Sequence, residues 1–95
     1  MDKPQLNQFS DIFSSKLSKN TSGITYLLKT FVPNVWGSEN SFGVYYSAIL
    51  NSEVAEFSLV IDVFNGKPTL RGNFIGLPQS PLISLIQSDV VTALS

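Results

Sequence analysis

The chain contains neither histidine nor cysteine, so proton transfer would have to rely on tyrosine, lysine, aspartate or glutamate, and the carboxylates are the first candidates to consider. Acid–base catalysis by two carboxylates needs them within about 5–10 Å of each other. The candidates are Glu39, Glu53, Glu56 and Asp62. On an extended strand, the six-residue spacing from Glu56 to Asp62 corresponds to about 20 Å. The sequence therefore predicts solvated surface carboxylates rather than a catalytic pair.

Other motifs for catalysis or cofactor binding do not occur in the sequence. The glycines match neither a GxGxxG nor a P-loop spacing, and there is no Ser-x-x-Lys or Gly-x-Ser-x-Gly. Without cysteine and histidine, the usual ligands of a zinc site are missing. The triplet Asn20-Thr21-Ser22 matches the N-glycosylation pattern, and we interpret this short match as accidental. We expect no enzyme, no cofactor and no metal site.

The composition predicts one small domain with more apolar surface than it can bury within itself. The chain has 95 residues, of which 43% are hydrophobic and only 14% are charged, against a usual charged share of about 25%. A domain with so few charged side chains tends to cover part of its surface with a partner or a second copy of itself. We therefore expect a protein partner and a homodimer.

The charge pattern argues against nucleic-acid and membrane partners. Net charge is −1, and the only local basic pair is Lys16 and Lys19, which is too sparse for a phosphate-binding stripe. No stretch approaches the ~20 apolar residues of a membrane-spanning helix. The N-terminal segment also lacks the apolar core of a signal peptide. A cytoplasmic location is the expectation.

Two helices and one ambiguous segment follow from apolar spacing. Residues 4–19 show apolar side chains at helical intervals, and Ser80-Pro81 is a typical helix start. In residues 21–32, Ile24, Leu27, Leu28 and Phe31 lie at i, i+3, i+4 and i+7, which favours a helix. Their β-branched and aromatic neighbours favour a strand. We prefer the helix and keep the strand as the alternative.

Alternating apolar residues predict strands at 42–50 and 54–64, and a third strand follows the Asn65-Gly66 turn. A two-residue loop at Ser52-Glu53 would join the first two strands. Pro68, which lacks an N–H, predicts that the third strand is an edge. The expected pairs are Ala48–Phe57, Tyr46–Leu59 and Val44–Ile61 in the first hairpin, and Ile61–Leu70, Leu59–Gly72 and Phe57–Phe74 in the second.

These elements predict a single α+β domain over residues 1–95, in the order α(α)βββα. The three-stranded meander would have two edges, and its first strand would be open to an added strand from a partner. On the other side of the sheet from the core, the register places an apolar face. Its members, with a neighbouring loop tryptophan, are the predicted partner-binding residues Trp36, Tyr45, Ile49, Val60, Phe64 and Ile75.

Each of these residues also has a simpler interpretation. Trp36 is either an interface anchor or a plug over the end of the sheet with its indole N–H bonded to a carbonyl. The apolar face is either a contact surface or the underside of one of the first two helices. We expect a non-catalytic protein-binding module of the adaptor, assembly chaperone or inhibitor type, acting through this face, an exposed edge strand and the C-terminal helix.

The alternative function is a carrier of a small apolar ligand. Its pocket would lie between the sheet and the C-terminal helix. The predicted lining residues are Tyr46, Phe57, Leu59, Phe74 and Ile86.

Overall fold

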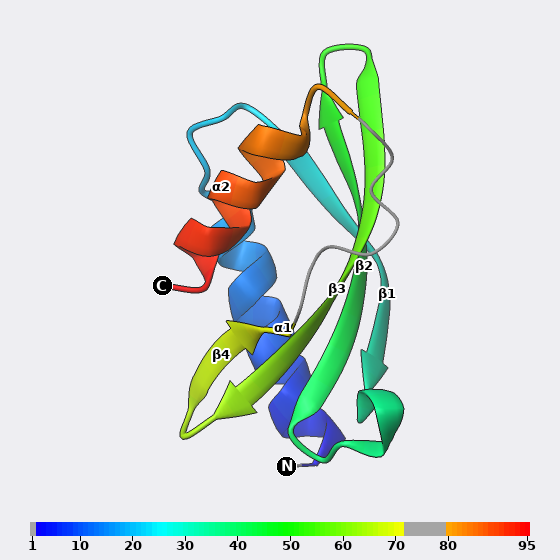
Figure 1. The fold of residues 1–95 in the computed structure, drawn as a ribbon, viewed down its shortest axis with the longest axis vertical. Coiled ribbons are helices and arrows are strands. Elements are labelled where there is room, and N and C mark those ends of the chain that lie inside the picture. The colour runs from blue at the N-terminus through cyan, green and yellow to red at the C-terminus, as the bar shows by residue number, and fades with distance from the viewer. Residues whose placement is uncertain (1, 72–79) are drawn as a thin grey trace.

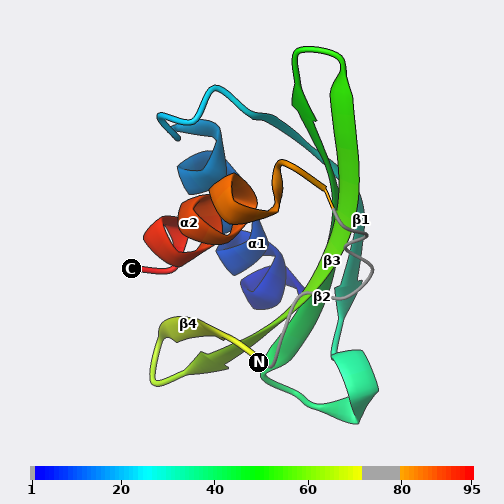
Figure 2. The ribbon, with the colours of Figure 1, turned by 45° about the horizontal axis from the view of Figure 1, so that its top comes forward.

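The computed structural model describes residues 2–71 and 80–95. Its elements are α1 (Lys3–Ser18), β1 (Thr25–Pro33), the short 3-10 helix η1 (Val35–Gly37), β2 (Ser41–Leu50), β3 (Glu53–Phe64), β4 (Lys67–Leu70) and α2 (Ile83–Ala93). The strands form one antiparallel sheet in the order β1-β2-β3-β4. Both helices lie against the same face of the sheet (Figures 1 and 2). The predicted α+β fold is confirmed, with four strands instead of three.

Helix α1 begins with a capping box that the sequence analysis did not include. The Asp2 carboxylate accepts a hydrogen bond from the Gln5 N–H at 2.9 Å, and the Gln5 side chain accepts one from the Asp2 N–H at 3.1 Å. Together these bonds satisfy two of the free N–H groups of the first turn. Leu6, Phe13 and Leu17 are buried along one face, so the predicted amphipathic helix is confirmed with bounds shifted by one residue.

Residues 25–33 form strand β1, so the preferred helix for residues 21–32 is wrong and the strand alternative is right. The helical spacing of Leu27 and Leu28 was misleading, because both side chains are largely exposed, at 44% and 41%. What decides the conformation is the neighbouring strand. As a strand, this segment hydrogen-bonds along β2, whose backbone would otherwise lack a partner on that side.

Strand β2 is therefore a central strand and not the open edge that the sequence predicted. Its register with β3 also differs from the prediction, because the turn is at Asn51-Ser52, one residue earlier than expected, with Asn51 at φ 56°. Tyr46 now pairs with Phe57 in place of Leu59. The shift is an even number of residues, so every side chain keeps its predicted face.

The second hairpin follows the prediction where the structure describes it. Asn65 and Gly66 both have positive φ, at 51° and 76°, as the predicted turn requires, and Ile61 pairs with Leu70. Strand β4, which contains Pro68, lies at the edge of the sheet as expected. The predicted pairs with Gly72 and Phe74 lie outside the described residues.

Helix α2 begins later than Ser80-Pro81 predicted. Ser80 caps a preceding turn, since its Oγ accepts a hydrogen bond from the Leu82 N–H at 3.1 Å, and the helix starts at Ile83. Ile86 and Val90 pack into the core, whereas Leu85 and Val91 are exposed. None of the helices in the described ranges is long and apolar enough to cross a membrane.

The core lies between the sheet and the two helices. Its largest fully buried side chains are Tyr46, Phe13, Phe42, Phe57, Leu6 and Leu17. They come from α1, β2 and β3, so the helix-side face of the central strands is filled by the chain itself. That leaves the opposite face of the sheet, which we call the outer face, without a covering helix among the described elements (Figure 2).

Candidate interface on the outer sheet face

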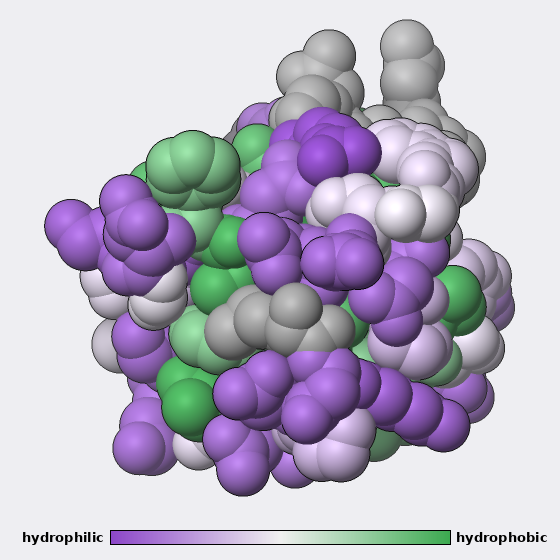
Figure 3. All heavy atoms as spheres, turned by 90° about the horizontal axis from the view of Figure 1, so that it is seen from below, coloured by the Kyte–Doolittle hydropathy of each residue, from purple (hydrophilic) through white to green (hydrophobic). Residues whose placement is uncertain are grey.

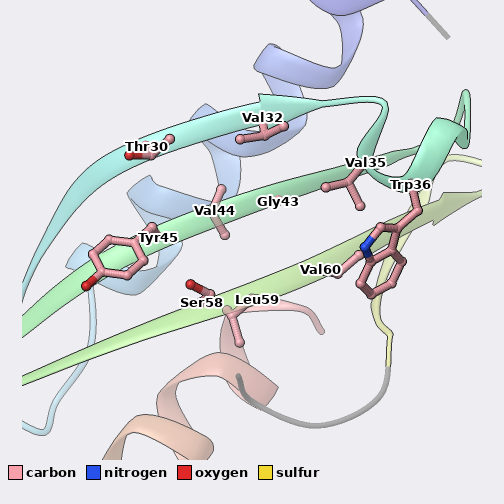
Figure 4. Close-up of a pocket in the computed structure, with 10 residues that line it drawn as sticks. All are labelled: Thr30, Val32, Val35, Trp36, Gly43, Val44, Tyr45, Ser58, Leu59 and Val60. Atoms are coloured by element: carbon pink, nitrogen blue, oxygen red, sulfur yellow. The ribbon is translucent and has the colours of Figure 1, made fainter. Parts of the chain in front are cut away.

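A groove of about 230 Å³ runs across the outer face. It is lined by Thr30, Val32, Val35, Trp36, Gly43, Val44, Tyr45, Ser58, Leu59 and Val60. Tyr45 and Trp36 stand at opposite ends of this row of side chains (Figure 4). Residues from β1, η1, β2 and β3 therefore meet around one apolar hollow.

Gly43 forms the floor of the groove at the point where η1 approaches the sheet. A Cβ at this position would lie 3.3 Å from Cγ2 of Val35 and 3.9 Å from Cβ of Val32. A side chain here would fill the hollow and press against η1. The absence of a side chain at this position of β2 therefore creates the depth of the groove.

Trp36 is held over the end of the groove by an unusual backbone. Asn34, Trp36 and Gly37 all have positive φ, at 53°, 55° and 72°. For a bulky residue such as Trp36 this conformation is strained by roughly 1–3 kcal/mol. The side chain is 69% exposed. The chain thus accepts backbone strain to present an indole to solvent, which is more typical of a contact residue than of a buried plug.

Arg71 fixes the other side of the indole. Its guanidinium carbon lies 5.5 Å from the centre of the Trp36 ring, in the range of a cation–π contact. The same guanidinium bonds both oxygens of Asp62, from Nε at 2.7 Å and from Nη2 at 2.6 Å. Ser41 donates to Asp62 at 2.7 Å. Asp62 and Arg71 therefore form an ion pair that is connected to Trp36.

Asp62 is stabilised in its charged form by these contacts. Partial desolvation raises the pKa of its carboxyl, but the hydrogen bonds from Arg71 and Ser41 and the Arg71 charge outweigh desolvation and lower the pKa below 3.8. The carboxylate therefore stays ionised at neutral pH and keeps Arg71 under the indole.

Tyr45 makes the corresponding polar contact at the other end of the groove. Its hydroxyl donates to Glu56 on β3, and this hydrogen bond raises the pKa of Tyr45 above 10. The ring of Tyr45 is half-buried. Both ends of the groove thus combine an aromatic ring with a polar partner.

The structure brings together only some of the predicted contact residues. Trp36, Tyr45 and Val60 line the groove, although Val60 is only 6% exposed and lies at its base. Ile49 lies on the same face but pairs with Val54, toward the far end of the hairpin. Ile75 lies outside the described residues.

Phe64, like Ile49, is a predicted contact residue that does not line the groove. It is 73% exposed and lines a neighbouring hollow with Asp62 and Arg71. It lies next to the β3–β4 turn, at the lower end of the molecule, where hydrophobic side chains occur in small groups among hydrophilic ones (Figure 3). Singly exposed apolar residues are normal on protein surfaces, so Phe64 serves as a comparison for Trp36.

Sequence reasoning missed the part of the groove that β1 supplies. Thr30 and Val32 were assigned to a helix, and Gly43 was not considered as a floor. The signal that would have found them is the β-branched content of residues 25–32, which pointed to a strand. Nothing in the sequence indicated the contact between Arg71 and Trp36.

The space proposed for an apolar ligand is occupied by packed side chains. Tyr46, Phe57, Leu59 and Ile86 are at most 1% exposed, and the rings of Tyr46 and Phe57 stack with centroids 5.6 Å apart. Phe74 lies outside the described residues.

Within residues 2–71 and 80–95 there is no group of three or more side chains that could hold a metal ion. Comparison of the chain with protein-family models, with curated proteins and with solved structures gives no match. The outer-face groove and its aromatic ends are therefore the basis for a functional proposal.

Proposed function

We propose that this protein is a non-catalytic protein-binding module, of the adaptor, assembly chaperone or inhibitor type, that engages its partner through the outer face of the sheet. The observation that carries the proposal is Trp36, a 69% exposed indole held in a strained backbone at the end of an apolar groove. Tryptophan and arginine are the side chains most enriched among binding hot spots. Here Trp36 and Arg71 are already in contact with each other.

Preorganisation supports the same proposal. The Arg71–Asp62 pair holds the indole from one side, so little side-chain entropy is lost when a partner covers it. A partner residue inserted into the groove would meet apolar walls on β1 and β3 and the glycine floor on β2.

Two further surfaces are part of the proposal. The exposed edge is strand β1, in the role that the sequence analysis gave to β2. Helix α2 contributes Leu85 and Val91, which are 38% and 65% exposed. A homodimer is one form of the proposed assembly, since a second copy would bring the same apolar groups to the interface. We also propose a cytoplasmic location, in line with the composition of the chain.

The test compares Trp36→Ala with Phe64→Ala, two truncations of exposed aromatic side chains. Partner recovery from native lysate is measured by quantitative pulldown, and self-association is measured by sedimentation velocity over a range of concentrations. Loss of recovery or of self-association with Trp36→Ala alone is expected. Because Trp36 is the only tryptophan, a blue shift of its emission on binding gives a second readout.

Two results would contradict the proposal. One is a protein that stays monomeric and recovers nothing specific. The other is a complex that both variants retain equally.

A further inference from the structure

Strand β1 is an edge strand with nine residues, about 30 Å long. Strand β2 covers one side of it, and no other strand pairs with it among the described residues. Its other side therefore offers backbone N–H and C=O groups for hydrogen bonding. Pro33 lacks an N–H and closes this series at the C-terminal end.

The exposed apolar side chains of β1 are distributed over both of its faces. Leu27 pairs with Ser47 and faces outward, whereas Leu28 pairs with Tyr46 and belongs to the helix side. Together with Val32, which lines the groove, they are 41–45% exposed. A strand added at this edge would cover apolar surface on both of its faces. In strand addition the main-chain hydrogen bonds supply affinity, and contacts with alternate side chains such as these supply specificity.

Lys29 determines what kind of strand fits. It is the middle residue of β1 and the only charge on it, and it lies at a bulge where the pairing with β2 shifts between Leu28 and Thr30. It is exposed, and no ion pair to it is present within the described ranges. A central lysine and a bulge are devices that limit the unselective pairing of an edge strand with another chain, a second copy included.

The charge of Lys29 therefore disfavours pairing of β1 with a second copy of the chain and favours pairing with a different, acidic partner. In an antiparallel pair of two β1 strands centred on the middle residue, Lys29 would lie opposite Lys29 of the second copy. Like charges directly opposite each other are destabilising, and opposite charges stabilise. The edge is thus complementary to an acidic strand.

We propose that the free edge of β1 binds an extended segment of a partner protein that carries an acidic residue between apolar residues. The segment adds a fifth strand, with its carboxylate near Lys29 and its flanking side chains over Leu27, Leu28 and Val32. This inference rests on the proposed protein-binding function and identifies the chemistry of the partner segment.

The experiment is selection of a displayed library of random twelve-residue peptides on the folded protein, on Lys29→Glu and on Lys67→Glu. Lys67 is an exposed lysine on the opposite edge strand and serves as the matched control. We expect wild type and Lys67→Glu to select peptides with a central Asp or Glu among β-branched residues. Lys29→Glu should select Lys or Arg at that place. An identical charge preference for all three proteins would overturn the inference.

A second measurement tests strand addition without changing the protein. In a bound strand, alternate N–H groups point toward β1. The best peptide is therefore made in two N-methylated versions, one with methyl groups on the odd-numbered residues and one with methyl groups on the even-numbered residues. The version whose methyl groups replace the N–H groups that point toward β1 should bind at least tenfold more weakly, and the other version should show a much smaller effect. Equal effects of the two versions would show that no ladder forms.

These experiments can contradict the proposal for the β1 edge without contradicting the proposed protein-binding function, and the reverse also holds. Selected peptides that lose binding with Trp36→Ala but not with Lys29→Glu would overturn the edge inference and support the groove. Failure to select any peptide would also overturn it, whereas the proposed function is judged by the comparison of Trp36→Ala with Phe64→Ala in the pulldown.

Discussion

Tyr45 and Tyr46 are neighbours on β2, yet they belong to two different kinds of surface. Tyr46 is 1% exposed, stacks on Phe57, and makes a 2.5 Å hydrogen bond with Ser14 of α1. Tyr45 is half-buried on the outer face and bonds Glu56 on the adjacent strand. The same residue type on the same strand thus closes the core in one case and lines an open groove in the other.

The polar contacts of the two faces differ in the same way. On the helix side, the hydroxyls of Tyr26 and Ser22 both donate to Asp89 of α2 at 2.6 Å, joining segments more than 60 residues apart. Burial and the Asp89 carboxylate raise the pKa of Tyr26 well above its usual range. On the outer face, the Tyr45 hydroxyl reaches the neighbouring strand, and Arg71 reaches Asp62 on β3 and Ser41 on β2. On the helix side these bonds join the sheet side of the molecule to helix α2, whereas the polar contacts of the outer face join the strands and η1 to one another.

The largest expected difference is between Phe57→Ala and Phe64→Ala. Phe57 is buried at the centre of the core, so its truncation should lower the free energy of unfolding by about 3–5 kcal/mol. Phe64 is 73% exposed, and its truncation should cost less than about 0.5 kcal/mol. Urea unfolding followed by circular dichroism measures both. Similar losses for the two variants would mean that the outer face also stabilises the fold.

The next comparison is between Val60→Lys and Tyr45→Lys. Val60 is 6% exposed at the base of the groove, so a lysine there must displace its neighbours and should cost about 1–3 kcal/mol. At Tyr45 the new ammonium reaches solvent beside Glu56, and only a small loss of stability is expected. Urea unfolding measures the loss of stability of each variant, and the pulldown measures its loss of partner binding.

If Tyr45→Lys abolishes partner binding while the protein stays folded, the groove is a contact surface. If Tyr45→Lys instead unfolds the domain, the face that we describe as open is part of the core. That result would remove the distinction between the two tyrosines.

How far the sequence predicts this fold depends on how local the determining contacts are. The Asn65-Gly66 turn and the alternation along β3 involve residues close in sequence, so the core face and the β4 edge were predicted correctly. The turn at Asn51 was missed, because the polar residues at 51–53 permit two loops that keep the same faces. Only the side-chain packing of Tyr46 on Phe57 distinguishes them.

Strand β1 shows where local reasoning fails. Its apolar residues satisfy a helical spacing, and its β-branched content was not enough to outweigh that signal. The deciding contact is the pairing with β2, whose partner residues lie from 9 positions (Pro33–Phe42) to 24 positions (Thr25–Ile49) later in the chain. Because β1 supplies one wall of the groove, the groove could not be predicted once this segment was predicted to be a helix. Asn20, in the triplet that matches the glycosylation pattern, has a structural role. Its side-chain amide donates hydrogen bonds to the carbonyls of Leu17 and Ile24 and so fixes the turn after α1.

A smaller effect is expected from Tyr46→Phe at alkaline pH. Burial is the main reason that the pKa of Tyr46 is raised to about 12 from 10.0. Above pH 10 the unfolded chain loses this proton while the native state keeps it, so native stability is fully present below pH 10 and falls as pH rises toward 12. Urea unfolding between pH 9 and 11.5 should show a shallower decline for Tyr46→Phe than for wild type. If the free energy of unfolding falls equally with pH in wild type and Tyr46→Phe, Tyr46 does not contribute to the alkaline loss of stability.

The smallest effect concerns Asp62, whose pKa is lowered on the outer face. Its contribution to stability is present above pH 3.8 and is lost as pH falls through the lower native pKa. Because Asp62 and Arg71 are 26% and 40% exposed, Asp62→Asn should cost at most about 1 kcal/mol, and less in high salt. The more sensitive readout is Trp36 fluorescence, since protonation of Asp62 releases the Arg71 guanidinium that the carboxylate holds beside the indole. An emission change between pH 2 and 4 in wild type, absent in Asp62→Asn, would show that this pair positions the tryptophan. An identical change in both proteins would mean that the indole is held by its strained backbone alone.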